Sequence, residues 1–160
     1  MGYAVKLQPQ VAQIYNGDKV NVALTGSNTG TFVFSVCYVA KDEVCLLSDT
    51  SMGTANWSTA CAKSWGWSCK IRGKQYSSSD SGQSVAKIPT LEEIKNNCAG
   101  YDNGSNYWSS TLYNQSGSTI WVWNINSSAN SYLAGRIAND YTTGQYARTS
   151  GIVPYIHVIL

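Results

Sequence analysis

Residues 107–125 read "YWSSTLYNQSGSTIWVWNI" and hold three of the six tryptophans of the chain. Short polar side chains and tyrosines surround these tryptophans, and no residue of the segment carries a charge. The segment therefore lacks the ionisable groups that transfer protons near neutral pH, and it favours a structural or binding role over a catalytic one.

The tryptophans of this segment are predicted to anchor a sheet. Trp108, Trp121 and Trp123 can each bury a large apolar area while the indole nitrogen donates to a loop carbonyl. Trp121 and Trp123 are two positions apart, so their side chains share one face of a strand. We expect all three in the core, with ligand stacking as the less favoured alternative.

Outward from this segment, the second half of the chain alternates short apolar runs with polar loops. The expected strands there are "YWSSTL", "STIWVWNI", "SYLAGRI", "YARTSG" and "YIHVIL". Near the other end, residues 19–40 contain two further strands around a Gly/Ser/Asn loop. Val20, Val22 and Leu24 alternate with polar residues, which predicts one buried face.

Two short helices are predicted between these regions. In "IPTLEEIKNNC", Thr90 and Glu93 form a capping-box pattern, and Leu91 and Ile94 are expected to face inward before an end near residues 96–97. In "NWSTACAKSW", Trp57, Ala60, Cys61 and Trp65 recur at helical spacing. The segment "KQYSSSDSGQS" is predicted to be a loop.

Together these elements predict one α+β domain over residues 1–160. Two helices would pack on small antiparallel sheets with long loops, preceded by a β-hairpin. A length of 160 residues is enough for one core of its own.

Composition excludes some classes of partner. Charged residues make up 12% of the chain, about half the usual share, and the net charge of +2 is spread without a run of Lys or Arg. A nucleic-acid interface is therefore not expected. A polar surface of this kind, rich in Ser, Thr and Asn, is typical of a secreted or cell-surface protein, whose export signal or anchor we expect outside this sequence.

Five cysteines are available for disulfides, at positions 37, 45, 61, 69 and 98. The spacings allow local pairs Cys37–Cys45 and Cys61–Cys69, with Cys98 free or replacing a partner in one of them. The alternative is five buried thiols that pack as small apolar residues. We expect at least one disulfide, and no zinc site, because Cys-x-x-Cys is absent and His157 is the only histidine.

Three motifs carry a resemblance to a known family. "NWSTACAKSWG", "KIPTLEEI" and the pair "YWSST" and "IWVWNI" resemble, in this order, the first helix, second helix start and strand pair of bacterial C-type-lectin-like surface domains. This family includes the C-terminal domain of a collagen-like adhesin. More distantly, the motifs are similar to formylglycine-generating enzymes and to variable proteins of diversity-generating retroelements. The resemblance covers roughly residues 55–160, after an N-terminal strand region over residues 1–50.

The resemblance implies a C-type-lectin-like fold that binds a ligand. The sugar- and calcium-binding motifs of calcium-dependent lectins are missing, and only Asp102 and Asp140 supply carboxylates after residue 100. We therefore expect no metal and no cofactor. An enzyme of the formylglycine-generating type would need a late reactive cysteine pair, whereas the last cysteine is Cys98.

The function favoured by the sequence is a non-enzymatic adhesin-like module that binds a protein or glycan on a cell or particle surface. Residues 101–150 contain seven Asn, nine Ser, six Tyr and five Thr, a palette similar to that of antibody paratopes. The same palette is compatible with a retroelement-diversified variable protein, and a minor pilin or tip assembly subunit remains an alternative. The expected ligand-binding residues are Tyr113, Asn114, Asn130, Tyr132, Arg136, Asn139, Asp140, Tyr141 and Tyr146, with a core position as the alternative for Tyr132.

Overall fold

The structure, a computed structural model, is built mainly of strands. It describes residues 13–116, 119–126, 132–138 and 149–160, and of residues 113–116, 119–120 and 132–138 it describes the backbone alone. Within these ranges, eleven strands and two short helices form two sheets. The predicted α+β layout of a C-type lectin is therefore wrong, since the chain forms a curled, half-barrel-like sheet with little helix.

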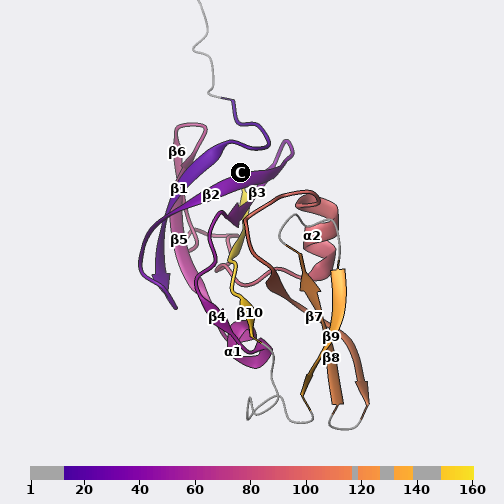
Figure 1. The fold of residues 1–160 in the computed structure, drawn as a ribbon. Coiled ribbons are helices and arrows are strands. Elements are labelled where there is room, and N and C mark those ends of the chain that lie inside the picture. Colours follow the sequence, from indigo (N-terminus) through magenta and orange to yellow (C-terminus); the bar gives the residue numbers. More distant parts are fainter. Residues whose placement is uncertain (1–12, 117–118, 127–131, 139–148) are drawn as a thin grey trace, which may run out of the picture.

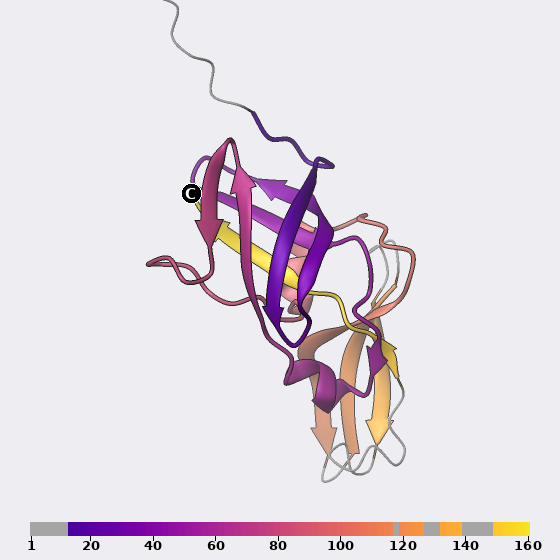
Figure 2. The same ribbon diagram turned by 90° about the vertical axis from the view of Figure 1, so that its left-hand side faces the viewer.

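The larger sheet has six antiparallel strands in the order β11-β3-β2-β1-β5-β6 (Figures 1 and 2). Its strands are β1 (Lys19–Gly26), β2 (Gly30–Val39), β3 (Glu43–Ser48), β5 (Trp65–Ile71), β6 (Lys74–Ser77) and β11 (Tyr155–Ile159). The predicted hairpin over residues 19–40 is confirmed as β1–β2, and Val20, Val22 and Leu24 are buried as expected. The C-terminal strand joins this sheet by pairing with β3.

The smaller sheet has five strands in the order β4-β10-β7-β8-β9. Its strands are β4 (Thr54–Ala55), β10 (Ser150–Gly151), β7 (Tyr107–Ser116), β8 (Thr119–Ile125) and β9 (Tyr132–Ala138). The three long strands β7–β9, here called the arm, extend away from the six-stranded sheet (Figures 1 and 2).

Helix α2 (Leu91–Asn97) is the predicted capped helix. Thr90 and Glu93 form the reciprocal capping box, and Leu91 and Ile94 are buried. Helix α1 (Trp57–Cys61) is shorter than expected, since Trp65 lies in β5. In "SWGWSCKI" the side chains at 65, 67, 69 and 71 are buried alternately, which is the period of a strand.

Two further expectations are corrected by the structure. The segment predicted to be a loop from residue 74 begins with strand β6, which pairs with β5. Among the three tryptophans, Trp108 is buried in the core, whereas Trp121 and Trp123 are only half-buried. The reason is position: Trp108 lies where β7 meets α1, and the other two lie on β8, the middle strand of the arm.

The described part of the chain also bears on cysteines and membranes. All five cysteines are free thiols in the structure, so neither local pair is bonded. No helix among the described residues is long and apolar enough to cross a membrane.

Candidate functional site

The expected binding residues fall on the arm and on the segments that follow its strands. Asn114 of β7 pairs with Trp121 of β8, which pairs in turn with Arg136 of β9. These three residues therefore form one row across the arm. Tyr113 and Arg136 were expected in loops or at strand ends, and they lie within strands, close to where β7 and β9 end.

The row lies near one end of the arm, here called the distal end. It is defined by Ser116, Thr119 and Ala138, because Ser116 pairs with Thr119 and Ile120 pairs with Ala138. The candidates Asn139, Asp140 and Tyr141 follow directly after Ala138 in the sequence. The chain thus leaves β9 toward these candidates at the same end at which β7 and β8 meet.

One candidate is separated from this group. Tyr132 pairs with Ile125, which pairs with Tyr107 at the opposite end of the arm. Arg136 lies four positions after Tyr132 in β9, which corresponds to about 13 Å of strand. The candidates Asn130, Asn139, Asp140, Tyr141 and Tyr146 lie outside the described residues.

Hydrogen bonds from the regions of α1 and α2 hold residues 108–111 of β7, here called the base of the arm. The Trp57 indole N–H donates to the Ser109 carbonyl at 2.9 Å, and the Trp108 indole N–H donates to the Ala55 carbonyl at 2.7 Å. On the α2 side, the Leu91 N–H donates to Thr111 Oγ1 at 2.9 Å. A base bonded to two separate elements holds the arm in a defined direction.

The pairing of β7 with β8 is irregular. The register shifts between Trp108 and Leu112, and again between Leu112 and Asn114. Bulges of this kind bend and twist a strand and redirect side chains, and they are over-represented near functional sites. The second shift lies between the fixed base, which extends to Thr111, and the row that contains Asn114.

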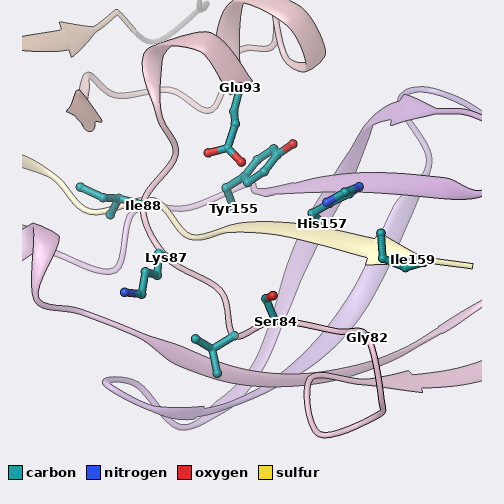
Figure 3. Close-up of a pocket in the computed structure, with 9 residues that line it drawn as sticks. Gly82, Ser84, Lys87, Ile88, Glu93, Tyr155, His157 and Ile159 are labelled. Carbon is teal, nitrogen blue, oxygen red and sulfur yellow. The ribbon is translucent and has the colours of Figure 1, made fainter.

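A second site, which the sequence analysis did not anticipate, is a pocket of about 260 Å³ between α2, β11 and residues 82–88 (Figure 3). It is lined by Gly82, Ser84, Val85, Lys87, Ile88, Glu93, Tyr155, His157 and Ile159. Figure 3 shows Glu93 reaching from α2 toward the Tyr155 ring. The sequence gives no local sign of this pocket, because its lining comes from two segments that are far apart in sequence, residues 82–93 and residues 155–159.

Three polar side chains of the pocket form hydrogen bonds within the protein. Glu93 Oε1 accepts from the Thr90 N–H at 2.8 Å, which completes the capping box. His157 Nε2 lies 2.6 Å from Glu43 Oε2 at the surface of the sheet. The Tyr155 hydroxyl accepts from Asn97 Nδ2 at 3.0 Å, and burial raises its pKa, so the phenol stays protonated.

Glu93 and His157 are the candidate groups of the pocket for proton transfer. A general base needs a free lone pair directed at a substrate proton, whereas Glu93 and His157 each direct an atom at a protein partner. Among the described residues, no group of three or more His, Cys, Asp or Glu side chains is placed to hold a metal ion.

Comparison with known proteins adds no assignment to either site. No family model, curated protein or solved structure matches the chain. The resemblance of three motifs to bacterial C-type-lectin-like domains therefore stays a prediction, and the layout that it implied is replaced by the two sheets described above.

Proposed function

We propose that the protein is a non-enzymatic extracellular binding module whose working surface is the distal end of the arm. The observation that carries the proposal is the register of β7–β9. This register places Asn114 and Arg136 in one row near the distal end. Ala138, which the candidates Asn139, Asp140 and Tyr141 follow in the sequence, lies at the same end.

The chemistry of these residues suits recognition of a protein or glycan surface. Tyrosine supplies a large rigid contact area, and Asn and Ser supply adaptable hydrogen bonds. Aromatic and Arg side chains also dominate binding hot spots. An arm with a fixed base supports such a surface, because a rigid scaffold lowers the entropic cost of ordering the binding residues.

The non-enzymatic part of the proposal rests on the pocket. Its carboxylate completes a helix cap and its histidine pairs with Glu43. Both groups thus have structural roles, and the residues of the arm offer amide, hydroxyl and guanidinium groups that suit binding.

The test is a triple variant, Tyr113→Ala with Tyr141→Ala and Tyr146→Ala. The intact protein is first screened against immobilised glycans and surface proteins. The variant should bind any ligand identified more than about 100-fold more weakly, since several hot-spot side chains are removed. Its melting temperature should stay close to that of the wild type.

A matched control is Tyr15→Ala. Tyr15 is exposed and belongs to the segment before β1. This segment lies at the end of the molecule opposite the arm (Figure 1), so removal of the Tyr15 ring should leave binding unchanged. Wild-type affinity in the triple variant would contradict the proposal. Unfolding of the triple variant would place those tyrosines in the core and would contradict it as well.

A further inference from the structure

Two cysteines far apart in sequence meet in the smaller of the two apolar cores. Cys37 Sγ lies 2.7 Å from Cys98 Sγ, although 61 positions separate the residues. Cys37 is on β2, and Cys98 is the C-cap residue of α2. Both side chains are buried, together with Cys45, Ile94 and Tyr155.

The structure favours this pair over the local pairs suggested by spacing. The contact of Cys37 with its neighbour Cys45 runs to the Cys45 main-chain carbonyl, at 3.3 Å. Cys69 belongs to the other apolar core, and Cys61 packs against that core from α1. A disulfide requires its two sulfur atoms at about 2.05 Å, and the sulfur atoms of Cys37 and Cys98 already face each other at close range.

We propose that Cys37 and Cys98 form a disulfide when the chain folds with a disulfide oxidant of the glutathione type. One cysteine thiolate attacks the oxidant, forms a mixed disulfide and releases one thiol. The second cysteine thiolate then attacks the protein-bound sulfur and releases the second thiol. The protein thus loses two protons and two electrons, and the oxidant is reduced to two thiols.

The bond should form while the chain folds rather than afterwards. The hydrogen bond with Cys37 and burial raise the pKa of Cys98 far above its ordinary value, so the Cys98 thiolate is scarce in the folded protein. The same burial excludes external thiols from the completed bond. We therefore expect slow oxidation of the folded reduced protein and slow reduction of the folded oxidised protein.

The bond would join two parts of the molecule. It would link β2 of the six-stranded sheet to the end of α2, whose N-terminal side bonds to Thr111 of β7. Closing a loop of this length restricts the unfolded chain more than the native one. The oxidised protein should therefore melt several degrees higher than the reduced protein.

Peptide mapping tests the proposal directly. The chain is refolded from the reduced, unfolded state with oxidised and reduced glutathione, unfolded again, alkylated and digested with trypsin without reduction. Cleavage after Lys and Arg places Cys37 in peptide 20–41, Cys45 and Cys61 in peptide 42–63, Cys69 in peptide 64–70 and Cys98 in peptide 96–136. The expected product is peptide 20–41 linked to peptide 96–136, with the other cysteines alkylated.

Matched variants test the expected rise in melting temperature on oxidation. Cys69→Ser should keep the rise in melting temperature on oxidation, whereas Cys98→Ser should lose it. The proposal would be overturned by peptide 42–63 linked to peptide 20–41 or to peptide 64–70. Alkylation of all five cysteines after refolding would overturn it as well. If Cys98→Ser fails to fold, the map of the wild-type protein still decides.

Discussion

Thr90 shows how one hydroxyl sets the start of a helix. Its Oγ1 accepts from the Glu93 N–H at 3.0 Å, while Glu93 Oε1 accepts from the Thr90 N–H. Thr90→Ala removes one of these bonds and should lower the free energy of unfolding by about 1 kcal/mol. Thr90→Ser keeps the bond and should stay near the wild-type value in urea denaturation. A wild-type midpoint for Thr90→Ala would mean that the cap contributes nothing.

Buried thiols make the reduced protein sensitive to alkaline pH. Burial raises the pKa of Cys45 from 9.0 to about 12, and that of Cys69 from 9.0 to about 11. Above about pH 9 the unfolded chain releases these protons while the folded chain retains them. Stability is therefore fully present below pH 9 and is lost as the pH rises toward 11 or 12.

Urea titrations in reducing buffer at pH 8 and at pH 10 measure this loss. Cys69→Ala should lose less stability than the wild type between these two pH values, because one shifted thiol is gone. An equal loss in both proteins would show that Cys69 ionises in the folded state at its ordinary pKa.

At the scale of elements, Gly151 allows β10 to fit between β4 and β7. A Cβ at this position would lie 2.6 Å from the Asn106 carbonyl oxygen and 3.0 Å from Ser51 Oγ. Gly151→Ala should therefore cost about 1–3 kcal/mol, as crowding in packed regions does. Thr54, its partner in register, is exposed, so Thr54→Ala should stay within about 0.5 kcal/mol of the wild type. Equal denaturation midpoints for Gly151→Ala and wild type would contradict this close packing.

The sequence predicted most of the elements that are determined by residues close together in the chain. The capping box located α2, and the alternation of Val20, Val22 and Leu24 located β1. Such local patterns failed where tertiary packing determines the structure. The "EVCLLS" segment of β3, for example, is buried on both faces and shows no alternation of apolar and polar residues. Trp65 fits the spacing of a helix begun at Trp57, yet its backbone pairs with Gly26 and Ala86.

The candidate site, too, was predictable in part from local sequence and in part depends on tertiary structure. Composition pointed to the arm and the segments after it, but the row of Asn114, Trp121 and Arg136 depends on pairing among three strands. Bulges in β7 shift that pairing, and no property of the sequence alone fixes their position. The pocket beside Tyr155 depends on contacts between residues that are far apart in sequence.

At the scale of the whole molecule, the two sheets share one core. Leu47 of β3 and Tyr155 of β11 lie in the same apolar cluster as Ile94 of α2, Tyr107 of β7 and Ile125 of β8. The six-stranded sheet and the base of the arm therefore bury part of their apolar surface against each other. Separate stability of the two sheets is not expected, because each would expose this cluster to water.

Ile94 tests this coupling, because it is fully buried where α2 joins both sheets. Ile94→Ala should lower the free energy of unfolding by about 2–5 kcal/mol. The loss should appear as one transition, with equal midpoints by far-UV circular dichroism and tryptophan fluorescence. Leu112→Ala, at an exposed position of β7, should leave the midpoint nearly unchanged. Two separated transitions, of which Ile94→Ala shifts only one, would show that the sheets unfold independently and that the shared cluster does not bind them into one cooperative unit.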